Sequence, residues 1–183
     1  MLYTRKGDGG TTKTLHCNQR LSKSSAVAEA LGTLDELNSW LGLCRAKGLA
    51  LKMPQGETLP AVLFEVQQNL FIVQAEVAGA EGKTIAPEKV TAMEMEIDAA
   101  ERELPPIKSF FIPGATEEGA ILDCARTLSR RAERRVVQVN EEGKIKLGAS
   151  SLAYLNRLSS LLYALARLAN HRAGAKEEAP SYK

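Results

Sequence analysis

Apolar residues recur every three or four positions through most of this chain, which is the spacing of one face of a helix. In the stretch around residues 25–47, for example, Val27, Leu31, Leu34 and Leu41 fall on a single face. Convincing alternation of apolar and polar residues, which would indicate strands, is missing. The pattern predicts five helices, over about residues 25–47, 59–81, 87–104, 116–139 and 149–172. Helices of this length with short connections predict an all-α fold, an antiparallel helical bundle of five helices.

The predicted helix over residues 116–139 carries five arginines within ten residues: Arg126, Arg130, Arg131, Arg134 and Arg135. At about 100° of rotation per residue, Arg126, Arg130 and Arg134 share an arc of roughly 100° on one helix face. Two acids, Asp123 and Glu133, lie on the same arc. A separate apolar stripe is formed by Ile121, Ala125, Leu128, Ala132, Val136 and Val139. The helix therefore has one side suited to a core and one densely charged side.

Two interpretations of this charged side are open at this point. One is a solvated helix face whose ion pairs contribute only tenths of a kcal/mol each. The other is a site for an anion with several oxygens, because the planar fork of arginine donors matches phosphate geometry. The Pro113-Gly114 pair ahead of the helix indicates a turn leading into it.

A second candidate for phosphate binding lies ahead of every predicted helix. Residues 4–12 are rich in glycine and threonine, and the basic residues Arg20 and Lys23 follow. Glycines let backbone N–H groups approach a phosphate, and threonine hydroxyls donate to it or ligate Mg²⁺. The spacing is not that of a Walker A loop. Taken alone, the segment fits a flexible terminus better than a binding site, because chain ends are usually disordered.

Other polar residues sit near predicted core faces. Asp35 lies beside an apolar stripe, where it is either an ordinary, partly exposed acid or an acid that needs a partner such as an arginine from another helix. Tyr163 and Asn170 share a stripe with leucines and alanines, and we interpret them as structural residues that bridge helices, whereas Asn156 is open to either reading. His16 and His171 have no nucleophile signature.

Composition and charge narrow the class of protein. At 183 residues with a net charge of +2, the chain fits one domain and gives no electrostatic case for binding nucleic acid or a membrane surface. Cys17, Cys44 and Cys124 lack metal-ligand spacing, so we expect reduced thiols. The N-terminal residues contain no apolar signal core, and no stretch is long enough to span a bilayer. The expected location is cytoplasmic.

Read together, the segments resemble a known family, the propanediol-utilisation (PduO) type ATP:cob(I)alamin adenosyltransferases. Its motifs match, in order, Thr4-x-x-Gly7-Asp8-x-Gly10-x-Thr12, Lys23, Glu29-Ala-Leu-Gly32-Thr-Leu-Asp35-Glu36-Leu-Asn38-Ser39, Phe110-Phe-Ile-Pro113-Gly114, Ala125-Arg126-x-x-x-Arg130-Arg131-Ala-Glu133-Arg134 and Tyr154-Leu-Asn156-Arg157-Leu-Ser159. Each fragment is weak alone, but their order over nearly the whole chain is specific.

The resemblance implies a bundle of the ferritin-like or four-helix-bundle type that assembles as a homotrimer, with active sites at subunit interfaces. It also implies three parts: a nucleotide-binding segment over residues 1–24, a helical bundle domain over 25–172 and a flexible C-terminal tail over 173–183. Candidate ATP-binding residues carried over from the motifs are Thr4, Arg5, Lys6, Gly7, Asp8, Gly10, Thr11, Thr12, Lys23, Arg130, Glu133, Arg134 and Asn156. Arg130, Glu133 and Asn156 would come from the neighbouring subunit.

The implied reaction transfers the 5′-deoxyadenosyl group of ATP to Co(I) of cobalamin and releases triphosphate, with Mg²⁺ held through the ATP phosphates and protein ligands unknown. The implied catalytic set is Phe110, Arg130, Asp35 and Arg126. Arg130 would hold polyphosphate, Asp35 and Arg126 would form an intersubunit salt bridge, and Phe110 would pack beneath the corrin ring. There it would exclude an axial ligand from cobalt and ease reduction of Co(II). Among the other arginines, Arg131, Arg134 and Arg135 stay closer to a solvated face.

Three notable features depart from the family pattern. They are Asp123, one turn before Arg126; the segment Thr14-Leu-His16-Cys17-Asn18, where many members are richer in glycine; and Pro113-Gly114-Ala115, where a second glycine is common. All three bear on substrate affinity more than on reaction class. Expected partners are ATP, cob(II)/cob(I)alamin, a reductase and an enzyme that accepts adenosylcobalamin. The alternatives are a non-catalytic ATP- or corrinoid-binding protein that delivers or senses adenosylcobalamin, and a helical oligomerisation module whose arginines only pair with acids.

Overall fold

In the computed structural model, five helices account for most of the chain, as the periodicity predicted. The structure describes residues 3–14, 20–47, 49 and 51–182, so His16 and Cys17 lie outside the described residues. The helices are α1 (Ala26–Ala46), α2 (Leu59–Val77), α3 (Pro87–Glu103), α4 (Glu117–Glu142) and α5 (Ala149–Arg172). Two predicted ends were wrong by three or four residues, since α2 ends at Val77 rather than near residue 81 and α4 continues to Glu142 rather than ending near residue 139.

Local capping chemistry sets several of these boundaries. The side chains of Ser25, Thr58 and Thr116 each accept a hydrogen bond from a backbone N–H in the first turn of α1, α2 and α4. Pro87 opens α3, where its missing N–H costs nothing. Gly143 ends α4 in the left-handed conformation, with φ 76°, which glycine adopts without strain.

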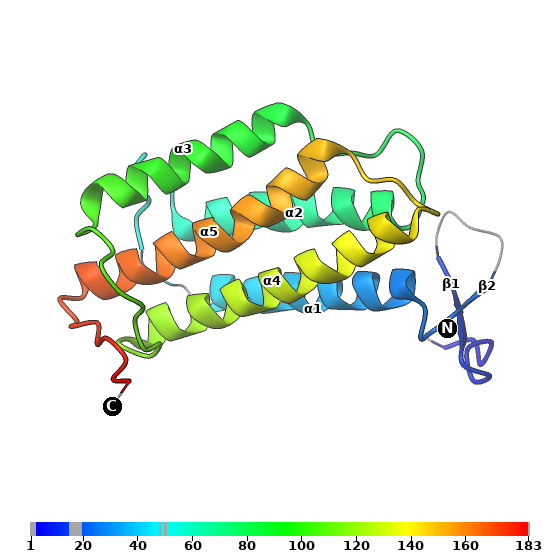
Figure 1. Ribbon diagram of the computed structural model, residues 1–183, viewed down its shortest axis with the longest axis horizontal. Coiled ribbons are helices and arrows are strands. Elements are labelled where there is room, and N and C mark those ends of the chain that lie inside the picture. Colours follow the sequence, from blue (N-terminus) through cyan, green and yellow to red (C-terminus); the bar gives the residue numbers. More distant parts are fainter. Residues whose placement is uncertain (1–2, 15–19, 48, 50, 183) are drawn as a thin grey trace.

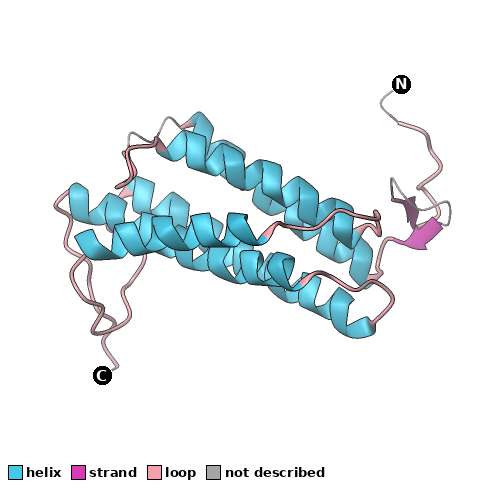
Figure 2. Ribbon diagram, turned by 90° about the horizontal axis from the view of Figure 1, so that it is seen from above, coloured by secondary structure: helices cyan, strands magenta, loops and turns pink. Residues whose placement is uncertain are grey.

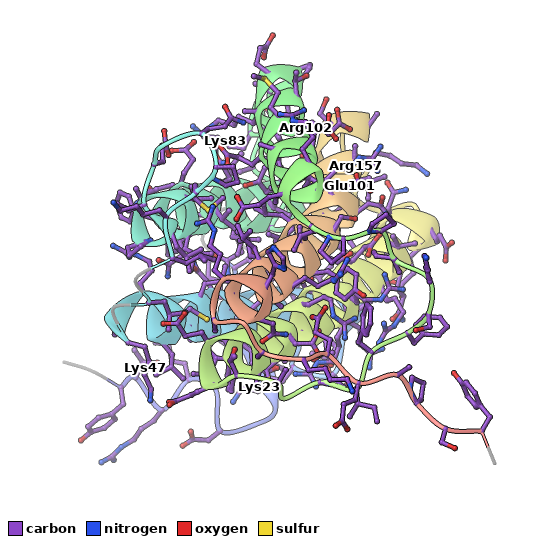
Figure 3. All side chains as sticks on the ribbon, turned by 90° about the vertical axis from the view of Figure 1, so that its left-hand side faces the viewer. Lys23, Lys47, Lys83, Glu101, Arg102 and Arg157 are labelled. Carbon is purple, nitrogen blue, oxygen red and sulfur yellow. The ribbon has the colours of Figure 1, made fainter. Side chains whose placement is uncertain are left out.

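Consecutive helices run antiparallel along the long axis of the molecule (Figure 1). Helix α4 packs on α1 and α5, α1 packs on α2, and α3 packs on α5. Viewed along the helices, α3 lies over α2 and α5, with α1 and α4 on the opposite side (Figure 3). Two ion pairs fix α3 there: Lys89 to Glu65 of α2 at 2.7 Å, and Glu94 to Arg157 of α5 at 2.7 Å.

The core is built mainly from leucine and alanine. Fully buried side chains include Leu34, Leu37, Leu41, Leu63, Leu70, Leu122, Leu155, Leu158 and Leu162. Trp40 joins two helices at the edge of this core, since its Nε1 donates to the carbonyl oxygen of Ile121 at 3.0 Å.

A buried carboxylate organises the end of the bundle where α5 begins. Gly148 is the N-cap of α5 and has no side chain to cap the helix. Glu76 of α2 takes over this role, because its Oε1 accepts from Gly148 N at 2.6 Å and its Oε2 accepts from the Ser151 hydroxyl. The same hydroxyl accepts from Ile85 N at 3.1 Å, so α2, α5 and the segment before α3 meet at one network.

A short hairpin precedes α1, and the sequence pattern did not predict it. Strands β1 (Thr11–Lys13) and β2 (Arg20–Ser22) pair antiparallel, with Thr12 opposite Leu21. Three residues are too few to establish an alternating pattern, which explains the omission. The hairpin lies at the end of the bundle where α1 begins, whereas residues 105–116 and the segment after α5 lie at the opposite end (Figures 1 and 2).

Candidate functional site

A cavity of about 690 Å³ lies between α4, α5 and the segment that connects α3 to α4. One part of its wall is apolar and comes from Ile107, Phe110, Phe111 and Ile112. The other part is polar and includes Arg126 and Arg130 of α4 with Ser159 and Tyr163 of α5. Asp123 and Glu177 also line the cavity, but Arg126, Arg130 and Arg167 outnumber them, so an apolar rim meets a wall with an excess of positive charge.

Phe110 stands at the rim of this cavity with 78% of its surface exposed. A large apolar side chain held so far into solvent gains little from folding, since its surface stays in contact with water. Gly114, four residues on, has φ 109° and lets the chain turn toward α4. This arrangement agrees with the predicted turn ahead of the arginine helix and leaves the Phe110 ring exposed at the cavity rim.

Arg126 is held in place within its own chain. Its Nε donates to Oδ1 of Asp123 at 2.5 Å, and its guanidinium lies 5.8 Å from the centre of the Tyr163 ring. Burial raises the pKa of the Tyr163 hydroxyl, so the ring stays neutral beneath the cation. The predicted partner Asp35 is exposed on α1 and forms no ion pair with any residue that the structure describes. The intersubunit pair of Asp35 and Arg126 stays a prediction.

Arg130 is exposed, lines the cavity, and has no ion pair or hydrogen-bond partner within the described ranges. One turn further on, Glu133 accepts from Asn156 Nδ2 of α5 at 3.0 Å. Asn156 in turn accepts from Arg157 at 2.7 Å. The structure therefore brings three candidate ATP-binding residues, Arg130, Glu133 and Asn156, to one stretch of the α4–α5 face. Arg134 is exposed and lies outside the cavity lining.

The remaining arginines of α4 face α1. Arg131 donates to Glu36, and Arg135 lies 3.4 Å from Glu29. These contacts are ion pairs between α4 and α1, whereas the sequence interpretation of Arg131 and Arg135 was a solvated helix face. Helix α4 thus presents two separate sets of arginines to two different neighbours.

The N-terminal candidates form a folded loop rather than an extended chain. Gly10 N donates to the carbonyl of Gly7 at 3.1 Å, and Lys23 N donates to the carbonyl of Gly10 at 2.9 Å. The ammonium of Lys23 lies beside Gly7, where an added Cβ would meet it at 3.3 Å. Arg5, with φ 58°, adopts a conformation uncommon for residues other than glycine. The other candidates here, Thr4, Lys6, Asp8, Thr11 and Thr12, lie on or beside the same loop.

Two arginines in these regions were missed as organising residues. Arg20 binds the N-terminal loop from β2: it donates to the Thr11 hydroxyl at 2.7 Å, to the Thr11 carbonyl at 2.8 Å and to the Lys6 carbonyl. Arg167 is 4% exposed in α5 and lines the cavity. A single charged residue inside the apolar run Leu165-Ala-Arg167-Leu-Ala is the one sequence signal that could have marked Arg167 as a buried charge.

Asn170, interpreted from sequence as a bridging residue, does bridge three segments. Its Oδ1 accepts from the Thr116 hydroxyl at 2.7 Å, and its Nδ2 donates to Glu177 at 3.0 Å. It packs so closely on Gly119 that a Cβ there would lie 2.1 Å from Asn170 Oδ1. A side chain at Gly119 would displace the Asn170 amide from its contacts with Thr116 and Glu177.

The described residues contain no group of three or more His, Cys, Asp or Glu side chains arranged to hold a metal ion. None of the helices that these residues form has the length and apolar character needed to span a bilayer.

Comparisons with known proteins agree with the residue-level picture. A family model described as cobalamin adenosyltransferase matches residues 2–169. The corrinoid adenosyltransferase PduO of Citrobacter freundii is 44% identical over 94% of this chain and 50% of its own length. The corrinoid adenosyltransferase of Bacillus subtilis is 39% identical over 94% of this chain and 88% of its own length. The chain thus spans about half the length of the PduO relative.

A solved structure gives the same match in three dimensions. A variant PduO-type ATP:corrinoid adenosyltransferase from Lactobacillus reuteri, complexed with cobalamin and ATP, superposes with a TM-score of 0.87. It is 31% identical, and the match covers 100% of this chain and 97% of that one.

Proposed function

Because the chain belongs to the cobalamin adenosyltransferase family, we propose that it transfers the 5′-deoxyadenosyl group of ATP to Co(I) of cobalamin, forming adenosylcobalamin and triphosphate. The observation that carries the proposal is the cavity of about 690 Å³ with its apolar rim and cationic wall. A corrin ring offers a broad apolar face and triphosphate offers many anionic oxygens. One cavity supplies a suitable surface to each.

The proposed chemistry needs no activated side chain. The nucleophile is cobalt, which attacks the 5′ carbon of ATP, and the leaving group is triphosphate. The protein's tasks are to hold the two reactants in line and to stabilise the charge that develops on the phosphate chain. Arg130 suits the second task, because its guanidinium faces the cavity and is not neutralised by an acid in the described chain.

Phe110 suits a different task. Its exposed ring at the rim would lie against one face of the corrin and exclude an axial ligand from cobalt. A cobalt centre without that ligand is easier to reduce from Co(II) to Co(I). The apolar character of phenylalanine is the useful property here, since a polar side chain would itself supply a ligand or admit water.

We place the N-terminal loop over the nucleotide, with Thr4, Gly7, Asp8, Thr11, Thr12 and Lys23 near the phosphates. This loop and the Phe110 rim lie at opposite ends of one chain, which supports an active site shared between chains and the proposed homotrimer (Figure 1). Exposed apolar side chains on α1 and α2, including Leu43, Phe64 and Phe71, offer contact area for such an assembly.

Mg²⁺ would bind with the nucleotide rather than at a preformed protein site. The oxygens of Asp8, Thr11 and Thr12 are of the hard type that Mg²⁺ prefers, but the described residues hold no cluster of acids. The phosphates would then provide most of the ligands, and the metal would supply charge neutralisation on the triphosphate. Asp8 and the two threonines would orient the loop around it.

The cell context follows from the same chemistry. Co(I) requires a reductase, and adenosylcobalamin requires an enzyme that uses it, so we propose one partner of each class.

Cys44 and Cys124 are free thiols, and burial raises the pKa of Cys44 to about 11, which keeps it protonated and unreactive. These thiols support a cytoplasmic location.

The direct test is to mix the protein with ATP, Mg²⁺ and chemically reduced cobalamin and to follow the absorbance spectrum. Appearance of the adenosylcobalamin spectrum faster than in a control without protein supports the proposal. Formation at the uncatalysed rate, with ATP bound to the protein, would instead identify a delivery or sensing protein. Absence of ATP binding would contradict both.

A further inference from the structure

Arg167 connects residues 105–114, which we call the Phe110 segment, to the rest of the molecule. Its side chain is buried, and its Nη2 donates to the carbonyl oxygen of Pro105 at 3.3 Å. Its guanidinium also stacks 4.9 Å from the centre of the Phe111 ring. A planar cation suits both contacts, because it can donate in its plane and stack on its face.

Residues 175–178, which we call the strap, complete this connection from the segment after α5. Glu177 Oε2 accepts from Arg167 Nε at 3.1 Å, and the side chain of Glu177 is 15% exposed. The next residue, Glu178, accepts from Ile112 N through its backbone carbonyl at 2.8 Å. Within the tail expected to be flexible, the strap therefore contacts the Phe110 segment.

The segment 105–114 depends on these outside contacts for its position. It forms no helix or strand, so no regular backbone ladder fixes it. Phe111 lines two cavities, the one of about 690 Å³ and a second one of about 330 Å³ that Lys108 and His171 also line. The segment therefore has room to move once the contacts of Arg167 and the strap are lost.

We propose that Arg167 and Glu177 are positioning residues that hold the Phe110 segment in the orientation required for the corrinoid. Glu177 neutralises the charge of Arg167 and orients its guanidinium. Arg167 in turn holds Phe111 and Pro105 in place. The backbone of Phe111 then determines where the side chain of Phe110 points. This inference rests on the proposed function for its consequence, a role in corrinoid binding. We call the contacts of Arg167 with Glu177, Phe111 and Pro105 the latch. Its existence is a structural claim that does not depend on the proposed function.

The test compares Glu177→Gln with Glu178→Gln. The first variant removes the charge facing Arg167, whereas the second alters a neighbouring exposed glutamate whose backbone carbonyl alone makes the strap contact. Hydrogen exchange over residues 105–114 reports the latch, and titration with cob(II)alamin and with ATP reports its consequence. We expect faster exchange and about tenfold weaker cob(II)alamin binding in Glu177→Gln, with unchanged ATP affinity and unchanged behaviour of Glu178→Gln.

The outcomes separate the two claims. Unchanged exchange in Glu177→Gln overturns the latch, whatever the protein does with cobalamin. Faster exchange with unaltered cob(II)alamin affinity overturns the positioning role. If wild-type protein binds no corrinoid, the proposed function fails while the exchange data still decide the latch. Should Glu177→Gln not fold, Phe111→Leu removes the stacking face at similar volume and must give the same pattern.

Discussion

Arg131 of α4 forms an ion pair with Glu36 of α1, while the arginine directly before it, Arg130, faces the cavity without an acidic partner in the described chain. Successive residues on a helix point about 100° apart, so neighbours in sequence serve different surfaces. The two arginines therefore form a matched pair for testing which face of α4 binds the substrate.

We expect Arg130→Ala to lower kcat/KM for ATP by about 10²-fold, because the phosphate chain loses a charged donor in the transition state. Arg131→Ala removes a largely exposed ion pair and should leave kcat/KM within about threefold, with a loss of stability below about 1 kcal/mol. Steady-state kinetics with reduced cobalamin and thermal melts measure the two effects. Equal losses of activity in two stable variants would contradict the division of the helix into two faces.

The Phe110 ring gives a prediction that separates two steps of the reaction. Phe110→Ala should bind ATP normally and keep most of its turnover with chemically prepared Co(I), because that assay bypasses the reduction. With Co(II) and a reductant, turnover should fall by at least about 10²-fold, since cobalt retains an axial ligand. The assay with Co(I) is thus the control for the assay with Co(II), because both use the same variant. Equal activity in the two assays would remove Phe110 from the reduction step.

Substitutions of Asp123 separate the effect of its negative charge from its role in positioning Arg126. Asp123→Asn keeps an oxygen for Arg126 Nε but removes a negative charge from the cavity wall, so KM for ATP should fall about two- to fivefold at low salt. Asp123→Ala also releases Arg126 and should lose that gain. The two KM values, measured at low and high ionic strength, check the argument. A higher KM in Asp123→Asn would show that the charge itself is needed.

Much of the fold was predictable, because helical periodicity, capping residues and turn residues agreed with one another. The five helices were predicted correctly, and so were four members of the apolar stripe of α4, Ala125, Ala132, Val136 and Val139. The other two, Ile121 and Leu128, are only partly buried, whereas Leu122 and Ser129, which the predicted stripe left out, are fully buried. The hairpin before α1 was not, because strands of three residues leave no pattern to detect. Helix ends at α2 and α4 depended on local caps and differed by three or four residues.

The candidate site was predictable only as a set of residue types. Spacing placed Asp123, Arg126 and Arg130 on one face of α4, and the structure adds the Tyr163 ring beneath Arg126. The roles of Arg167 and Glu177 were not readable, because their contacts join segments that lie far apart in sequence and meet only after folding. Pairing of Asp35 with Arg126 depends on a second chain and stays a prediction.

Substitution of the buried Glu76 should lower the free energy of unfolding without affecting the catalysed reaction. Glu76→Ala removes the acceptor for Gly148 N and the Ser151 hydroxyl, which should cost about 2–3 kcal/mol in the free energy of unfolding. Urea unfolding measures the cost. Glu81→Ala, at an exposed glutamate just past the end of α2, is the control and should change stability by less than about 0.5 kcal/mol. A similar loss in both variants would argue against the capping role of Glu76.

Glu96 of α3 predicts a change that depends on pH. Burial, together with the nearby charge of Glu57, raises the pKa of Glu96, and its Oε2 is buried without a hydrogen-bond partner in the described structure. A carboxyl whose pKa is raised on folding binds more protons in the folded state, so it lowers stability as pH rises above the ordinary glutamate value.

Glu96→Gln should therefore stabilise the protein at neutral pH and lose this advantage as pH falls below the ordinary glutamate pKa of 4.5. Since the side chain is partly solvated, the gain at pH 7 should be on the order of 0.5 kcal/mol. Unfolding in urea at pH 7 and at acidic pH, for wild type and variant in parallel, measures the difference. Glu88→Gln, at an exposed glutamate near the start of the same helix, controls for net charge. An advantage of Glu96→Gln that is equal at both pH values would trace its effect to packing rather than to the buried charge.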